Sequence, residues 1–315
     1  MEKIKIGISA CLLGHAVRYD GGHKLDRYLR DTLGRYVEYV PVCPEFECGL
    51  GVPREAMRLE GDPAAPRLIT RQTRIDLTDR MVSWARRRVI ELDAENLCGF
   101  IFKSDSPSSG MERVKVYNDK GMPFKTGVGI FAKTFMEHFP LLPVEDEGRL
   151  HDPQLRENFI ERIFTLRRWR ETTASENKRR AIMDFHTRHK LLLMSHSPKH
   201  YSLMGKIVAD QKKEPIGRLL AVYEKALMSA LQQKTSPSKN ANVLQHMMGY
   251  FKKDLSPDEK RELLEVIAQY KQGDLPLIVP VTLIHHYVRK YDQPYLKNQI
   301  YLDPHPLELH LRNHS

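Results

Sequence analysis

Residues 4–14 read IKIGISACLLG, and this stretch decides the fold of the first half of the chain. Ile4–Ile8 combines β-branched side chains with one glycine and predicts a short buried β-strand. A cysteine-bearing loop, Ser9–Gly14, begins where this strand ends. Such a strand followed directly by a reactive loop is typical of α/β proteins, which bind ligands at the carboxyl ends of parallel strands.

The rest of the first half repeats this alternation of strand and helix. Further strands are expected at 37–42, 97–102 and 141–144, and helices at 24–33, 77–92 and 129–139. Strands separated by helices pair in parallel, so we expect residues 1–148 to form an α/β domain with a doubly wound, mostly parallel sheet. The acidic run EDEG at 145–148 marks the expected boundary of this domain.

After residue 148 the pattern is helical throughout. The sequence SPDE at 256–259 combines an N-cap serine, a proline at the first helical position and a capping-box glutamate, and Gly273 is expected to end that helix. Ser197-Pro198 and Glu214-Pro215 predict two more helix starts. Residues 149–315 are therefore expected to form an all-α domain.

The composition narrows the class of protein. Of the 315 residues 41% are hydrophobic, which is enough for two packed cores. The longest apolar stretch, 275–284, contains two prolines and is far shorter than the roughly 20 residues of a membrane helix. With four cysteines and no apolar block of signal-peptide length at the start, the chain is predicted to be cytoplasmic, without disulfides and without a membrane partner.

The net charge of +10 is unevenly distributed. Residues 1–150 hold 23 Lys/Arg against 22 Asp/Glu, which leaves 27 against 18 for residues 151–315, so the two halves carry +1 and +9. A basic domain next to a neutral one suggests a polyanionic partner that the basic domain binds, although a solvated basic surface is an equal alternative on charge alone.

Three loops carry the candidate chemistry. They are Ser9–Gly14, the segment from Cys43 to Cys48, and Lys103–Gly110, and each follows an expected strand. Parallel strands would bring two cysteines, a glutamate and a serine-rich turn together at one edge of the sheet. Thiolates suit soft metals and iron–sulfur clusters, and the absence of any C-x2-C pair disfavours a structural zinc site. The alternative is that these cysteines are small core residues.

The order of motifs resembles a known family. SACLLG at 9–14, VRYDG at 17–21, CPE at 43–45 and SPSSG at 106–110 together resemble the thiouracil desulfurase (TudS) family over residues 3–145. FHTRHKLLLMSHSPKHY at 185–201 and KTSPSKNANVLQHMMGYFK at 234–252 resemble the YbgA-like helical domain. The two domains fused resemble the tRNA 4-thiouridine desulfidases of the RudS type.

This resemblance implies an enzyme with a 4Fe–4S cluster held by three cysteines, whose open iron acts as a Lewis acid on a thiocarbonyl sulfur. It implies redox-neutral desulfuration of 4-thiouridine in tRNA to uridine. Glu45 matches the catalytic glutamate, a general base and acid, and Ser106 matches a catalytic serine. The alternatives are desulfuration of free thiouracil-type bases, or a non-catalytic RNA-binding or iron–sulfur sensor protein.

The chain departs from the family pattern at one cluster ligand. Many desulfurases read SPSCG where this chain reads SPSSG, so Ser109 replaces the third cysteine. We predict that Cys48 takes this role beside Cys11 and Cys43. Ser109 itself, in a labile site, is the alternative, and Cys98 is expected at the far end of the sheet.

The helical domain supplies the candidate RNA contacts. Lys190, Lys199 and Lys206 are predicted to bind tRNA phosphates. Four nearby histidines have a spacing that zinc could use, but RNA contact or helix packing is the favoured interpretation; they are His186, His189, His196 and His200. A protein partner cannot be deduced from the sequence.

Overall fold

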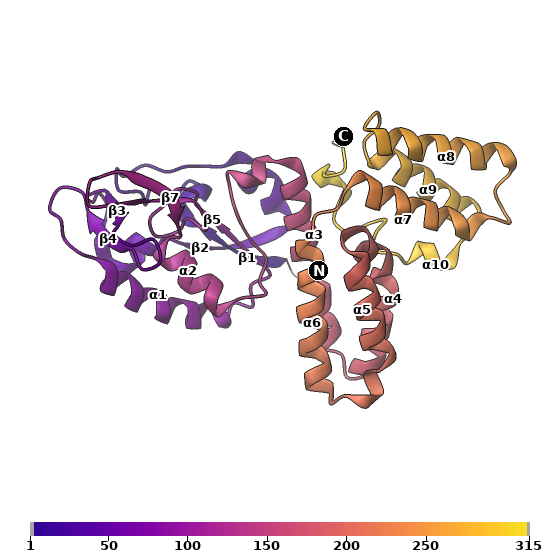
Figure 1. Cartoon of the computed structure of the whole chain (residues 1–315), viewed down its shortest axis with the longest axis horizontal. Helices are drawn as coiled ribbons and strands as arrows, with labels where there is room; N and C mark the ends of the chain where they lie inside the picture. Colours follow the sequence, from indigo (N-terminus) through magenta and orange to yellow (C-terminus); the bar gives the residue numbers. More distant parts are fainter. Residues whose placement is uncertain (1–2, 314–315) are drawn as a thin grey trace. The chain divides into compact units, whose positions relative to one another are not determined.

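The computed structural model describes residues 3–313, and the chain divides into two compact units at Asp152 (Figure 1). The first unit is an α/β domain and the second is helical, as the sequence predicts. The predicted boundary lies at residue 148, inside the first unit. None of the described helices is long and apolar enough to cross a membrane.

The main sheet of the first unit has four parallel strands in the order β2-β1-β5-β8. They are β1 (Ile4–Ser9), β2 (Val37–Val42), β5 (Phe100–Phe102) and β8 (Val144–Asp146). The chain adds β2 on one side of β1 and then β5 and β8 on the other, so the winding direction reverses at β1. Open sheets of this kind form a crevice at the carboxyl ends of the strands, at the point of reversal.

A second sheet was not predicted from the sequence. Its order is β4-β3-β6-β7, formed by β4 (Arg67–Thr70), β3 (Met57–Glu60), β6 (Val114–Tyr117) and β7 (Pro123–Gly127). Two antiparallel pairs, β3/β4 and β6/β7, meet through the parallel pair β3/β6. These strands have only four or five residues each, which is too short for a clear alternating pattern.

An aromatic core joins the main sheet to α1 (Thr78–Asp93) and α2 (Ile130–His138). Phe100 and Phe102 on β5 pack against Phe131 and Phe135 of α2, with ring centroids 4.6 Å apart for Phe100 and Phe135. Gly7 lies beside this cluster on β1, and a Cβ there would overlap the Phe100 ring. The glycine within the first strand therefore allows the aromatic core to pack against it.

One local prediction is wrong. A regular helix does not span 24–33; the chain there forms a single π-turn, η2 (Tyr28–Thr32), and a 3-10 turn, η3 (Leu33–Arg35). Backbone hydrogen bonds from Lys24 to Cys11 and from Asp26 to Leu12 hold the preceding residues against the first loop, so helix formation is delayed.

The acidic run at 145–148, at the expected domain boundary, lies partly in a strand. Glu145 and Asp146 belong to β8 and are 5% and 6% exposed. Arg149 compensates for their burial, because its Nε lies 2.6 Å from a Glu145 carboxylate oxygen and its backbone N–H donates to Asp146.

The second unit consists of helices joined by short connections (Figure 1). The longer ones are α3 (Pro153–Thr173), α4 (Lys178–His196), α5 (Pro198–Ala209), α6 (Ile216–Gln232), α7 (Pro237–Met248), α8 (Pro257–Gln272) and α9 (Ile278–Lys290). Helix α8 has the predicted capping box between Ser256 and Glu259 and ends at Gly273, and α5 begins after Ser197 as expected.

Candidate functional site

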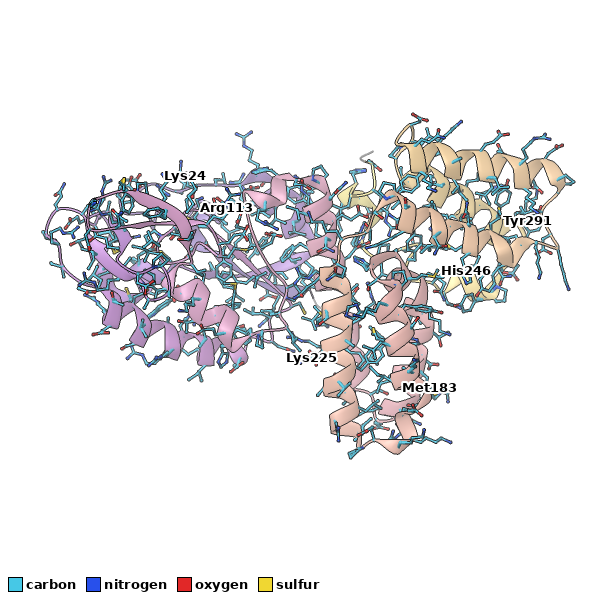
Figure 2. The ribbon with its side chains drawn as sticks, viewed as in Figure 1. Lys24, Arg113, Met183, Lys225, His246 and Tyr291 are labelled. Atoms are coloured by element: carbon cyan, nitrogen blue, oxygen red, sulfur yellow. The ribbon has the colours of Figure 1, made fainter. Side chains whose placement is uncertain are left out.

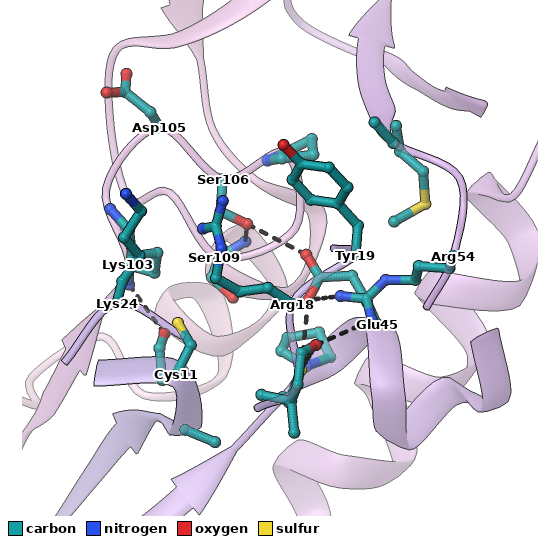
Figure 3. Close-up of a pocket in the computed structure, with 18 of the residues that line it drawn as sticks. Cys11, Arg18, Tyr19, Lys24, Glu45, Arg54, Lys103, Asp105, Ser106 and Ser109 are labelled. Carbon is teal, nitrogen blue, oxygen red and sulfur yellow. Dashed lines mark hydrogen bonds and ion pairs between the residues drawn. The ribbon is translucent and has the colours of Figure 1, made fainter. Parts of the chain in front are cut away.

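A cavity of about 380 Å³ opens at the carboxyl ends of β1, β2 and β5. The three loops that the sequence singles out all contribute to its lining. Cys11 follows β1, Glu45 follows β2 and Ser106 follows β5 (Figure 3), and Cys43 lines the cavity next to Glu45. Met57, the first residue of β3, and Arg71, which follows β4, complete the wall from the second sheet. The expected convergence of these loops is therefore a feature of the structure.

Two thiols face this cavity. Cys11 lies on the 3-10 turn η1 (Ala10–Leu13), and burial together with the Glu45 carboxylate raises the pKa of its thiol to about 11. Burial and Glu45 likewise raise the pKa of Cys43 to about 12. The Cys43 Sγ lies 3.6 Å from a Glu45 carboxylate oxygen and 3.7 Å from the carbonyl oxygen of Val17. Lys103 and Arg18 beside Cys11, and Arg54 beside Cys43, oppose these shifts, but burial outweighs them and favours the protonated thiols.

Glu45 is the carboxylate at the centre of the site. One of its oxygens lies 3.5 Å from Arg54 Nη2, and the same oxygen is the one near Cys43. The other oxygen accepts hydrogen bonds from the hydroxyls of Ser106, at 3.4 Å, and Ser108. The Arg54 side chain is only 8% exposed and also donates to the carbonyl oxygens of Val17 and Gly51. The arginine thus fixes the orientation of Glu45 between a thiol and two hydroxyls.

The serine-rich turn is held by its own backbone. The Ser106 hydroxyl oxygen accepts from the backbone N–H groups of Ser108, at 3.3 Å, and Ser109, at 3.1 Å. Gly110 closes the turn, since its N–H donates to the Ser106 carbonyl and a Cβ at this position would overlap Val114. Ser109 is 3% exposed and lines the cavity, at the position where the family pattern has a cysteine.

Cys48 lies beside the cavity but does not line it. It is on the π-turn η4 (Phe46–Leu50), and its Sγ is 3.4 Å from the carbonyl oxygen of Glu45. Burial raises the pKa of its thiol. Cys98 does not line the cavity either; its backbone N–H donates to Lys5, near the amino end of β1.

Several functional side chains were not predicted from the sequence. Ser108 is fully buried and bonds directly to Glu45, but a serine in a serine-rich turn carries no distinguishing signal. Arg18 and Tyr19 line the cavity, although a sequence pattern alone does not distinguish such residues from those of a solvated turn. Arg54 could have been noticed from the PRE segment that follows the cysteines, but its contact with Glu45 depends on the tertiary fold.

The donor set fits a thiolate-bound metal cluster. Cys11 and Cys43 bring two buried thiols from different loops to one cavity, with the Ser109 hydroxyl in the same lining. Iron–sulfur clusters accept cysteines from separate loops in this way. These side chains could hold such a group, while Glu45 and Ser106 remain available for a substrate.

The second unit carries the predicted RNA-contacting lysines on two adjacent helices. Lys190 is on α4, and Lys199 and Lys206 are on α5, seven residues and therefore about two turns apart on one face. Lys199 and Lys206 are exposed and Lys190 is half-buried. The structure does not test whether these lysines contact phosphates, so RNA binding by them stays a prediction.

Three of the four histidines singled out in the sequence are buried and therefore not available for RNA, whereas His200 is half-buried. His186, His189 and His196 are at most 3% exposed, so packing is the correct interpretation of these three. The ring of His186 contacts the Tyr223 hydroxyl at 3.1 Å. His196 lies between the carbonyl of Gln233 and the carboxylate of Glu161, at 2.7 and 3.0 Å.

The fold and the cavity together define a thiol-bearing α/β domain linked to a helical domain. Residues 6–147 match the family model described as 2-thiouracil desulfurase, and residues 190–306 match the one described as a protein of unknown function, DUF1722. The uncharacterized protein YbgA of Escherichia coli (strain K12) is 30% identical over 153 residues, which are 48% of this chain and 90% of the relative. A solved structure of the 4Fe–4S-dependent thiouracil desulfidase TudS is 30% identical, with a TM-score of 0.40, over 48% of this chain and 95% of that one.

The chain belongs to the YbgA family. It carries a TudS-like domain in front of its YbgA-like domain, which confirms the combination predicted from the motifs.

Proposed function

We propose that this protein is a 4Fe–4S-dependent desulfidase that converts 4-thiouridine in tRNA to uridine. The observation that carries the proposal is the convergence of two thiols, a carboxylate and a serine turn in one cavity, within a domain that matches the 2-thiouracil desulfurase family. A thiolated base is therefore the substrate class. The choice of tRNA rests on the basic helical domain.

Cys11 and Cys43 would hold the cluster, with Cys48 as the predicted third cysteine. When bound, the cluster supplies a Lewis-acidic iron that polarises the thiocarbonyl group of the substrate. At the position of the third ligand, Ser109 lines the cavity and Cys48 lies next to it. A rearrangement of η4 would be needed for the Cys48 thiol to enter the lining.

Glu45 is the proposed general base. Its carboxylate takes a proton from water, and the water oxygen bonds to the ring carbon that bears sulfur. Glu45 then returns this proton to the departing sulfur, which leaves as hydrosulfide as the carbon–sulfur bond breaks. The second proton of the water is released when its oxygen forms the carbonyl, so water and the thiocarbonyl give a carbonyl, hydrosulfide and one proton without any change of oxidation state. Ser106 Oγ, 3.4 Å from Glu45, orients the attacking water or the base.

The helical domain is proposed to bind the tRNA backbone. It carries +9 of the net +10, and its lysines at 190, 199 and 206 offer phosphate contacts. A free base needs no such domain, which favours tRNA over the alternative substrate.

Two other functions have specific support. Desulfuration of a free thiobase is consistent with the description of the matching family model. A non-catalytic iron–sulfur or RNA-binding role is consistent with Ser109 at the position of a cluster cysteine.

One experiment separates these functions. Anaerobically purified protein is incubated with thiolated tRNA, the tRNA is digested to nucleosides, and 4-thiouridine and uridine are quantified, with 2-thiouracil and 4-thiouracil assayed in parallel. We expect 4-thiouridine to disappear as uridine and sulfide appear. Turnover of the free bases alone would establish the alternative enzyme, and no turnover with intact iron would establish the non-catalytic role.

A further inference from the structure

The loop that carries Cys43 and Glu45 also carries a second carboxylate, which faces away from the cavity. Glu47 lies on η4, two residues after Glu45, and residues with this spacing on a helical turn point in different directions. Glu45 lines the cavity, whereas Glu47 does not belong to the lining. The Glu47 side chain is nevertheless only 26% exposed. Its position next to a thiol of the site therefore calls for an account of what it contacts.

Glu47 bonds to both polar backbone groups of Cys43. Its carboxylate Oε1 accepts a hydrogen bond from the Cys43 N–H at 2.7 Å. Its own backbone N–H donates to the Cys43 carbonyl oxygen at 2.9 Å. Since these bonds lie on either side of the Cys43 Cα, they fix the direction in which the thiol leaves the backbone.

Helix α1 holds the Glu47 carboxylate from its other side. Arg88 Nε lies 3.1 Å from the second Glu47 oxygen, and Arg88 Nη1 donates to Glu91 at 2.9 Å. The Arg88 side chain is 23% exposed, so this ion pair is partly shielded from solvent. A continuous series of contacts thus runs from α1 through Arg88 and Glu47 to the backbone of Cys43.

A second arginine of α1 binds the same loop. Arg80, about two turns before the first arginine, donates to the carbonyl oxygens of Cys48 at 2.8 Å and Gly49 at 2.7 Å. Between the two arginines, the buried ring of Trp84 packs against Phe131 of α2, and the two helices lie side by side (Figures 1 and 2). The cysteine loop is therefore fixed by a helix that is itself anchored in the core, although no described residue of α1 lines the cavity.

We infer that Glu47 is a positioning residue for the cluster ligand Cys43, with Arg88 holding its carboxylate. The inference rests on the assignment of Cys43 as a ligand in the proposed function. A ligand residue whose backbone is already fixed loses less conformational entropy when the cluster binds. Groups that orient metal ligands from outside the ligand set commonly contribute about 10- to 100-fold to the affinity for the metal.

The charges of Glu47 and Arg88 give this role a second consequence. Removing the Glu47 charge leaves the guanidinium less compensated near the cluster, and a positive charge favours the reduced, more negative state. Removing the Arg88 charge leaves the carboxylate less compensated and favours the oxidised state. The two substitutions should therefore shift the midpoint potential of the cluster in opposite directions, which a general loosening of the loop does not do.

The test follows iron in the full-length holoprotein, purified anaerobically. Wild type, Glu47→Leu and Glu47→Gln are mixed with an excess of an Fe(II) chelator, and the loss of the visible absorbance is timed. Glu47→Leu keeps the approximate size of the side chain but cannot accept from Cys43, so we expect iron loss about 10- to 100-fold faster. Glu47→Gln keeps an oxygen that can accept this bond, and we expect a rate within about threefold of wild type.

The midpoint potential is measured by redox titration of the same holoproteins. We expect a more positive value for Glu47→Gln and a more negative value for Arg88→Gln. The matched control is Glu91→Gln, which removes the other carboxylate on Arg88 at a side chain that is 62% exposed, and it should leave the rate of iron loss unchanged. A thermal melt of each variant reports its global stability, and if Glu47→Leu yields no folded holoprotein, the two potential shifts decide.

Equal rates of iron loss for wild type and Glu47→Leu would overturn the inference, as would potential shifts of the same sign for Glu47→Gln and Arg88→Gln. The proposed function fails separately. If Glu47→Leu loses iron faster but the wild-type holoprotein desulfurates neither thiolated tRNA nor a free thiobase, the positioning role stands and the desulfidase assignment falls. If the wild type desulfurates and Glu47→Leu retains iron like the wild type, only the positioning role falls.

Discussion

Glu45→Gln is the substitution that tests the chemistry most directly. The glutamine keeps the size of the side chain and one oxygen that can accept from Ser108, but it cannot accept a proton from water. The usual contribution of a positioned base predicts that turnover falls by about 10²- to 10⁴-fold. Both cavity cysteines remain, so iron content should not change.

The structure also indicates how much stability Glu45→Gln should lose. Arg54 loses its anionic partner at 3.5 Å while its side chain stays 8% exposed, but it keeps its hydrogen bonds to Val17 and Gly51. Loss of one partner of a buried charged group costs on the order of 1–3 kcal/mol. We therefore expect a folded, slightly less stable protein.

The assay follows sulfide release from thiolated tRNA under anaerobic conditions, with iron content and a thermal melt for each variant. Glu38→Gln, on the exposed side of β2, is the matched control and should retain full turnover. Glu45→Ala should behave like Glu45→Gln with a larger loss of stability. Full turnover of Glu45→Gln would refute the assignment of the base, and a loss of iron would instead make Glu45 a ligand or a scaffold residue.

Three other predictions follow from the same structure. Cys11→Ala and Cys43→Ala should each lose the iron and the broad visible absorbance. Cys48→Ala distinguishes the two candidates for the third ligand: loss of iron supports Cys48, and retention of iron points to Ser109. In the helical domain, burial and the nearby Lys190 lower the pKa of His186 to about 4. Between about pH 6.5 and pH 4 this histidine is therefore protonated in the unfolded chain but neutral in the native state. His186 should therefore contribute a loss of roughly 2 kcal/mol in stability between pH 7 and 5. The measurement compares urea titrations of a Trp84→Phe protein, which leaves Trp169 as the reporter, with and without His186→Gln; the same pH dependence in both proteins would contradict this. Neutralising the lysines at 190, 199 and 206 together should weaken tRNA binding and flatten its salt dependence without changing turnover of a free thiobase, and unchanged tRNA affinity would mean that the helical domain has another role.

The sequence by itself determined the class of both domains. The hydrophobic runs at β1 and β2 and the capping box at Ser256 depend on neighbouring residues, and such local signals can be interpreted without a structure. The motifs around Cys11, Cys43 and Ser106 likewise identified the domain and the edge of the sheet that carries its chemistry. These features are encoded over a few residues each.

Only the tertiary structure decided which side chains face one another. The second sheet forms from strands of four or five residues whose pairing partners are distant in the chain, so local propensity is too weak to reveal it. Glu145 is buried in a strand despite its charge because Arg149 neutralises it. Ser108 reaches Glu45 across 63 residues, and Cys48, the nearest cysteine in sequence to Cys43, lies outside the cavity lining that Ser109 joins. Such contacts depend on the path of the whole chain, and a linear pattern carries no information on the direction in which a side chain finally points.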